Sequence, residues 1–228
     1  MRRIPALSVG VLIPAHNEGD TVALTLRSLA RLPGLRRLIL VDDGSDDDTV
    51  QKARSMGAHV IRMTEQSGKG AAVRRGLDYL SDCPFVLLLD ADLGDTSAQA
   101  WRLLRPVING SADVTVARFS RQAAGSGFGI VKAVARTAVS ILAGARVESV
   151  LSGQRALSQK ALKSVSRFDD GYGLETGMII DLLRHGMKVV EVDVDMKHKD
   201  YGRTLHGFCH RGRQLLDIAV AVASRACL

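Results

Sequence analysis

Two carboxylates follow a short apolar run at a spacing that would let them share one ligand. Residues 85–89 are apolar and contain no Gly or Pro, and Asp90 and Asp92 follow with only Ala91 between them. In an extended segment the side chains of residues i and i+2 point the same way. A hard divalent cation, Mg²⁺ or Mn²⁺, that bridges to a diphosphate would suit such a pair. The alternative is two loop carboxylates that cap a helix, because Asp-X-Asp is common by itself.

A second polar group follows another apolar run, at residues 38–41. Asp42, Asp43, Gly44 and Ser45 come directly after this run, and Lys69 lies further along between two glycines. Asp43 could accept hydrogen bonds from a base or ribose, and Lys69 could neutralise a nearby phosphate. A solvated turn that caps a helix is the alternative for residues 42–48. Neither a GxGxxG fingerprint after the first strand nor a Walker A motif is present, which disfavours a nicotinamide, flavin or P-loop site.

Alternating strand and helix patterns must position these residues. Strands are expected at residues 7–13, 38–41, 59–62 and 85–89, with helices ending near residues 32 and 56 and a third beginning near Lys69. This alternation predicts an α/β fold with a mostly parallel central sheet flanked by helices. Ligands of open α/β sheets bind beyond the carboxyl ends of the strands, where both polar groups would lie.

The second half of the chain is less regular. Expected strands lie at residues 113–117 and 188–194, and expected helices at residues 130–143, 158–165, 176–184 and 215–223. No repeat, linker or low-complexity segment divides the sequence. We therefore predict a single domain over residues 1–228, in which residues 1–105 bind a nucleotide and residues 106–228 form the acceptor side.

Composition and charge disfavour several classes of protein. The net charge is +7, but aromatic residues make up only 4%, which argues against a base-stacking nucleic-acid module and for phosphorylated small molecules or an anionic membrane surface. Three cysteines without a CxxC pair indicate a reducing compartment without disulfides or structural zinc. The sequence contains no 18-residue apolar run and no convincing signal-peptide cleavage site. We expect a cytoplasmic protein, with peripheral contact at the inner face of the membrane left open.

Taken together, the motifs resemble family 2-type glycosyltransferases with the GT-A fold, a Rossmann-like domain. The similarity lies, in order, in residues 11–18 (VLIPAHNE), 41–45 (VDDGS), 68–70 (GKG) and 90–92 (DAD). The resemblance implies a nucleotide-sugar donor, usually a UDP-sugar or GDP-mannose, and a metal held by Asp92 with Asp90 nearby. It also implies a set of nucleotide-sugar contacts, namely Pro14, Ala15, Asn17, Glu18, Asp43, Gly44, Ser45, Lys69, Asp90 and Ala91.

The second half resembles two groups of family 2 enzymes at once. Residues 152–157 (SGQRAL) are similar to a segment of polyprenyl-phosphate sugar transferases, and residues 171–177 (GYGLETG), followed by His198, look like glucosyl-3-phosphoglycerate synthases. The second similarity implies that His198 is a metal ligand, that Tyr172 lies near the donor and that Glu175 positions the sugar or acceptor. Without the resemblance, His198 reads as a surface histidine and Glu175 as a helix-dipole partner in a glycine-flanked turn just before a helix.

The acceptor side carries the least specific signal. The expected acceptor contacts are Gly127, Phe128, Gly129, Lys132, Gln154 and Arg155, and Arg203 is expected to help bind the donor diphosphate. Phe128 stands where the synthases have an arginine, so the acceptor is left open between a phosphorylated small molecule and a polyprenyl phosphate. The apolar helices at residues 130–143 and 215–223 are expected to be core, with a membrane-surface role as the alternative.

We therefore predict a metal-dependent hexosyltransferase that moves a sugar, such as glucose from UDP-glucose, to an anionic acceptor. Asp92, Lys69 and Glu175 would be its catalytic residues, and Asp90, Asp92 and His198 would hold Mg²⁺ or Mn²⁺. A phosphate acceptor is already anionic at neutral pH and needs little help from a general base. The alternatives are a polyprenyl-phosphate glycosyltransferase at the membrane surface and a catalytically silent module that binds nucleotide sugars. A homodimer is left open.

Overall fold

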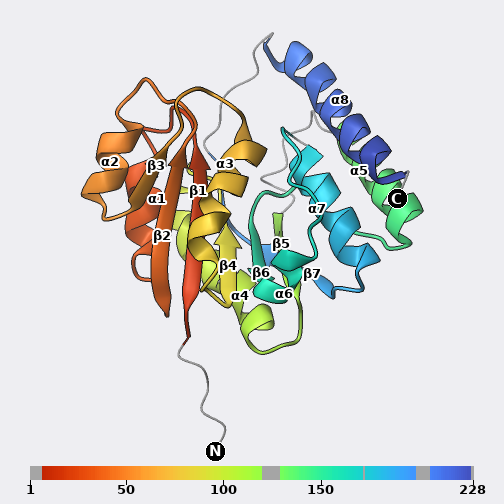
Figure 1. Ribbon diagram of the computed structural model, residues 1–228, viewed down its shortest axis with the longest axis horizontal. Helices are drawn as coiled ribbons and strands as arrows, with labels where there is room; N and C mark the ends of the chain where they lie inside the picture. The colour runs from red at the N-terminus through yellow and green to blue at the C-terminus, as the bar shows by residue number, and fades with distance from the viewer. Residues whose placement is uncertain (1–6, 120–128, 172, 199–205, 227–228) are drawn as a thin grey trace, which may run out of the picture.

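A seven-stranded sheet forms the centre of the molecule (Figure 1). The computed structural model describes residues 7–119, 129–171, 173–198 and 206–226. The strands lie in the order β3-β2-β1-β4-β6-β5-β7. Their bounds are β1 Val9–Ala15, β2 Leu35–Asp42, β3 His59–Arg62, β4 Phe85–Leu88, β5 Val114–Phe119, β6 Arg155–Ser158 and β7 Val189–Val194. Only β6 runs antiparallel to its neighbours, β4 and β5, so the predicted mostly parallel α/β sheet is confirmed.

Helices cover both faces of the sheet, which explains why its central strands are apolar without interruption. Leu12, Val41 and Val86 point into one core cluster, whereas their neighbours Ile13 and Leu40 point into the other. The first cluster includes side chains of α3 (Lys69–Leu77), α5 (Gly129–Ala143), α6 (Gln159–Lys163), α7 (Gly173–Arg184) and α8 (His206–Ala226). The second includes side chains of α1 (Val22–Leu29), α2 (Thr49–Ser55) and α4 (Ala100–Ile108). Two 3₁₀ helices, η1 (Asp78–Leu80) and η2 (Gly94–Gln99), complete the order.

The second half departs from the sequence expectations in four elements. Strand β6 occupies a stretch for which no strand was expected, and the helix after it has only five residues. Helix α7 begins at Gly173, so Glu175 lies in its first turn and not, as expected, in a turn before the helix. Helix α8 begins at His206, well before the apolar stretch that predicted it. Strand β6 contains no β-branched or aromatic residue, unlike the equally short β3 and β4, and glycines mimic a turn where α7 begins.

Helices α5, α7 and α8 pack against one another at the side of the molecule away from β3 (Figure 1). The expectation that α5 and α8 contribute to the core is confirmed, because both bury apolar residues such as Val131 and Ile218. Each also exposes large apolar side chains, namely Ile130, Val134 and Ile141 on α5 and Leu216 and Val220 on α8. Within the described residues, no helix combines the length and apolarity needed to cross a bilayer.

Candidate active site

The parallel strands β1, β2 and β4 deliver the predicted polar residues to one edge of the sheet. Pro14 and Ala15 end β1 and pair with Val41 and Asp42 at the end of β2. Asp90 and Asp92 come directly after β4, which pairs with β1 on its other side. Parallel strands place their carboxyl ends at the same edge, and the crevice outside that edge is where open α/β sheets bind ligands.

Three potential metal ligands meet at this edge. One ligand atom from each of Asp90, Asp92 and His198 lies within 4.8 Å of the other two. His198, which follows β7, has its Nδ1 2.9 Å from Asp92 Oδ1, and its ring lies 5.2 Å from that of Phe119. Two carboxylates and an imidazole form a donor set that suits Mn²⁺, and the carboxylates alone suit Mg²⁺. The residues present therefore fit the divalent cation that the sequence predicts.

His198 and Asp92 form a charge-coupled pair. Burial by itself would lower the pKa of His198, but the hydrogen bond to Asp92 and the charges of Asp92 and Asp90 raise it above its usual value. A cation bound by this cluster would have to displace any proton shared between imidazole and carboxylate, because metals bind the neutral ring.

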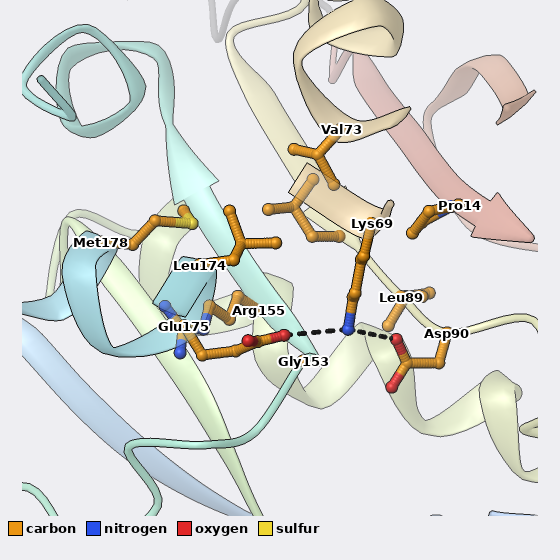
Figure 2. A pocket seen from close by; sticks show the side chains of 11 residues that line it. Pro14, Lys69, Val73, Leu89, Asp90, Gly153, Arg155, Leu174, Glu175 and Met178 are labelled. Atoms are coloured by element: carbon orange, nitrogen blue, oxygen red, sulfur yellow. Dashed lines mark hydrogen bonds and ion pairs between the residues drawn. The ribbon is translucent and has the colours of Figure 1, made fainter. Parts of the chain in front are cut away.

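Lys69 lies between two carboxylates that come from different halves of the chain (Figure 2). Its Nζ donates to Asp90 Oδ1 at 2.7 Å and to Glu175 Oε1 at 2.9 Å. Burial by itself would lower the pKa of Lys69, yet the charges of Asp90 and Glu175 and their hydrogen bonds raise it well above its usual value. Lys69 is therefore a cation whose position is fixed by two carboxylates.

Asp90 is held from both sides. Gln154 Nε2 donates to Asp90 Oδ2 at 2.6 Å, while Lys69 occupies the other carboxylate oxygen. Burial alone would raise the pKa of Asp90, but the charge of Lys69 brings it below its usual value. A Cβ atom at Gly153 would lie 2.6 Å from Lys69 Nζ, so this pairing requires the glycine. Gly153 was missed by sequence reasoning, although it lies inside the quoted SGQRAL segment.

Asp43 fixes the loop that leads into Lys69. Its carboxylate accepts the backbone N–H groups of Ser67 at 2.7 Å and Gly68 at 2.8 Å. Gly68 has φ 93°, a value open to glycine, and α3 begins at the next residue. The side chain of Asp43 is thus committed to the backbone, although each carboxylate oxygen can accept a further hydrogen bond from a nucleotide.

The loops after β1 and β2 are joined by side-chain hydrogen bonds to backbone groups. Asn17 has φ 55°, its N–H donates to Ser45 Oγ at 2.9 Å, and its Oδ1 accepts from Asp46 N at 3.0 Å. Glu18 N donates to Thr49 Oγ1 at 2.8 Å, and Glu18 Oε2 accepts from Thr21 Oγ1 at 2.9 Å. Gly44, in the loop after β2, has φ 75°, a backbone conformation that glycine adopts readily. Four of the residues expected to contact the nucleotide, Asn17, Glu18, Gly44 and Ser45, therefore lie on one rim of two loops that are joined by hydrogen bonds.

Arg155 lies beneath the site, and only 1% of it is exposed. Its Nε donates to the Ser152 carbonyl at 2.9 Å and its Nη2 to the Val150 carbonyl at 2.8 Å. Nη1 is buried and finds no partner among the described residues. Burial lowers the pKa of Arg155 to about 10. Figure 2 shows Arg155 beside Glu175, where it lines the same pocket as Lys69 and Asp90.

The remaining expected acceptor and donor residues divide into two groups. Gly129 and Lys132 lie in the first turns of α5, the former exposed and the latter half-buried. Gly127, Phe128, Tyr172 and Arg203 lie outside the described residues, so their roles stay predictions. Sequence reasoning did not find Leu174 and Met178, which line the pocket from α7; apolar residues in a helix gave no signal that would separate them from core.

Comparison with known proteins gives a consistent result. Residues 10–146 match the model of the family described as Glycosyl transferase family 2. Glycosyltransferase AglJ of Haloferax volcanii is 30% identical over 188 residues, which cover 81% of this chain and 61% of that protein. Glucosyl-3-phosphoglycerate synthase of Mycobacterium tuberculosis is 32% identical over 201 residues, covering 76% and 60%. The chain thus spans about three fifths of the length of these two relatives.

Solved structures of a related enzyme have the same fold. The synthase from Mycobacterium tuberculosis in complex with Mn²⁺, UDP and phosphoglyceric acid has a TM-score of 0.79 and 27% identity, covering 96% of this chain and 78% of that one. The same enzyme with Mn²⁺, UDP-glucose and glycerol 3-phosphate has a TM-score of 0.76 and 27% identity, covering 96% and 79%.

Proposed function

Because the chain belongs to glycosyl transferase family 2, we propose that it is a metal-dependent glycosyltransferase that moves a hexosyl group from a UDP-sugar to a phosphorylated acceptor. The observation that carries the proposal is Lys69, a half-buried cation held between Asp90 and Glu175 beside a cluster of three potential metal ligands. Similar enzymes are known in complexes with Mn²⁺, UDP-glucose and phosphorylated acceptors, which supports this choice of donor and acceptor class.

In this proposal the site stabilises charge on the departing diphosphate. Asp90, Asp92 and His198 would hold the Mg²⁺ or Mn²⁺ ion, which supplies positive charge to the diphosphate when bound. Lys69 would keep its proton and donate to an oxygen of the donor, and its position is fixed before the substrate arrives. Glu175 would orient the donor or acceptor by accepting a hydrogen bond from a hydroxyl group. An acceptor that attacks through its ionised phosphate oxygen has no proton to lose, whereas an attacking hydroxyl group would pass its proton to an oxygen of the departing diphosphate.

The nucleotide would lie on the rim beyond β1 and β2. Its proposed contacts are Pro14, Ala15, Asn17, Glu18, Asp43, Gly44, Ser45 and Ala91. These residues lie at the carboxyl edge of the sheet or in the loops that follow it. Asp43 supports the proposal in a second way, because it holds the backbone of Ser67 and Gly68 and thereby places Lys69 next to the rim.

A second candidate acceptor is a polyprenyl phosphate at the inner face of the membrane. The observation that favours it is the exposed apolar face of α5, formed by Ile130, Val134 and Ile141. The sequence of this helix contains Lys132 and Arg136 and no acidic residue, as a helix on an anionic membrane surface requires. A second copy of the chain could cover the same face, and light scattering of the purified protein would detect such a dimer.

The deciding experiment supplies labelled UDP-glucose, Mn²⁺ and both acceptors, 3-phosphoglycerate and a polyprenyl phosphate, in one reaction. Label in the organic phase identifies a lipid-phosphate acceptor, and label on an aqueous product other than the donor and free glucose identifies a small phosphorylated acceptor. Metal-dependent release of UDP without acceptor labelling keeps the enzyme class and rejects both acceptors. A donor panel with neither release nor transfer would contradict the proposal and leave a silent nucleotide-sugar-binding module.

A further inference from the structure

Arg225, near the carboxyl end of α8, ties three parts of the chain together away from the substrate pocket. The residue is 1% exposed. Its Nε and Nη2 donate to the two carboxylate oxygens of Asp181 on α7, at 2.7 and 2.9 Å. Its Nη1 donates to Asp169 Oδ2 at 2.6 Å, and its Nη2 also donates to the Arg167 carbonyl at 3.0 Å. One guanidinium thus satisfies groups on α7 and in the loop that precedes it.

Helix α7 packs against α8 with one side (Figure 1) and lines the pocket with an adjacent side. Gly173, Gly177 and Asp181 follow one another at four-residue spacing and meet α8. A Cβ atom at Gly177 would lie 2.6 Å from Arg225 Cζ, and one at Gly173 would lie 2.8 Å from the Asp217 carbonyl oxygen. The adjacent side presents Leu174, Glu175 and Met178 to the pocket. The position of α8 therefore determines the position of the helix that carries Glu175.

The loop at residues 164–171 connects Arg225 to the opposite wall of the pocket. A Cβ atom at Gly70 would collide with the carbonyl oxygen of Asp169, so the loop lies directly against the residue that follows Lys69. Asp169 itself is only 4% exposed and is held by Arg225. Ser166 at the other end of the loop donates to Asp181 Oδ2 from its N–H and its hydroxyl, at 3.1 and 2.7 Å.

From these contacts we propose that Arg225 is a positioning residue that sets the separation of Lys69 and Glu175, which lie on the two walls that it joins. The proposal rests on the function proposed above for that pair. A buried ion pair costs nearly as much in desolvation as it returns in attraction, so stability alone is a weak reason for this arrangement. The ion pairs of Arg225 would instead serve as a rigid link that keeps the two walls in place, because a misplacement of about 1 Å at a catalytic group can cost about 100-fold in rate.

The test compares Arg225→Lys and Arg225→Met with the control Arg184→Met. Arg184 also ties α7 to its neighbours, through the carbonyls of Leu142 and Arg225, but among the described residues it forms no hydrogen bond or ion pair with the loop at residues 164–171. Two quantities are measured for each folded variant. The first is kcat and KM for UDP-glucose, normalised to folded enzyme, and the second is amide hydrogen exchange in residues 67–71 and 173–178.

We expect Arg225→Met to lower kcat by about 10- to 100-fold with a change in KM of less than about threefold. Arg225→Lys should fall between it and the wild type, because an ammonium cannot serve Asp181 in bidentate fashion and also reach Asp169. Exchange should become faster in both pocket segments. The control should retain wild-type kcat and exchange in both segments.

Four results would overturn the proposal. They are a wild-type kcat in both Arg225 variants with only a lower melting temperature, an equal loss in the control, unchanged exchange in both segments, and failure of both Arg225 variants to fold. The last would assign Arg225 to the core alone. If the wild type itself shows no turnover, the proposed function fails, and hydrogen exchange still decides whether Arg225 links the two walls.

Discussion

The two walls of the pocket hold their charged side chains by different means. On the wall formed by β1, β2 and α3, carboxylate, amide and hydroxyl side chains bind backbone N–H groups, as Asp43 and Asn17 do. On the wall formed by α7 and β6, the support consists of buried ions, with Arg155 beneath Glu175 and Arg225 behind α7. The donors on the first wall are neutral backbone groups, whereas on the second wall removal of one ion leaves a buried charge without its partner.

This difference predicts distinct sensitivities for the two walls. Changes at the first wall should act locally, since each side chain serves one turn of backbone. Changes at the second should act on stability and pH dependence together, because removal of one partner leaves a buried charge alone. Lys69 lies on the first wall and pairs with Glu175 on the second, so it depends on both.

The largest effect is expected at Lys69 itself. Lys69→Met should lower kcat by about 100- to 1000-fold, the size expected when a fixed donor to developing charge is removed. UDP release under saturating donor and Mn²⁺ measures it. Lys52→Met is the matched control. Lys52, like Lys69, is held by two oxygen atoms, here the carboxylate of Asp48 and the carbonyl of Gly19, but it lies on the surface. The rate of this variant should equal that of the wild type. Equal losses in the two variants would contradict a special role for Lys69.

A large effect on stability is expected at Asp181. Burial would raise its pKa, but the hydrogen bonds from Arg225 and Ser166 hold the pKa of Asp181 below its ordinary value of 3.8. The carboxylate therefore stabilises the folded state above pH 3.8, and this contribution is lost as the pH falls through the folded-state value. Asp181→Asn should reduce the free energy of unfolding at pH 7 by about 3 kcal/mol and flatten the loss of stability in acid.

Asp193 provides the control for Asp181. Its hydrogen bond with Arg118 also lowers its pKa, but the pair is on the surface. Surface ion pairs contribute little, so Asp193→Asn should leave urea unfolding curves nearly unchanged at both pH 7 and pH 4. A stability loss at Asp193 as large as that at Asp181 would contradict the claim that burial makes the Asp181–Arg225 pair important.

The smallest effect is expected at Asn17 on the first wall. Asn17→Ala places a residue that disfavours φ 55° in the loop and removes the acceptor for Asp46 N, which should cost about 1 kcal/mol. Asn17→Gly relieves the backbone and should cost less. Thermal unfolding of the two variants separates these contributions, and an alanine variant as stable as the glycine variant would show that φ is unimportant there.

The two walls also differ in how far the sequence predicts them. Strands β1 to β4 and the carboxylates after them follow from apolar runs and short motifs, and the structure brings Asp90, Asp92 and His198 together as the sequence reasoning expected. Strand β6 and the start of α7 were not predicted, because β6 lacks β-branched and aromatic residues and α7 begins among glycines. Arg225 meets partners 44 and 56 residues away, and no local pattern marks such a contact.

The central claim is that Asp90, Asp92 and His198 form a metal site that serves sugar transfer. The most direct measurement is UDP release from UDP-glucose by the wild type and by Asp92→Asn, each with Mn²⁺ and with a chelator, alongside circular dichroism. The account predicts release by the wild type with Mn²⁺ only, and none by the variant, although both are equally folded. Near-normal release by Asp92→Asn, or by the wild type in chelator, would contradict it.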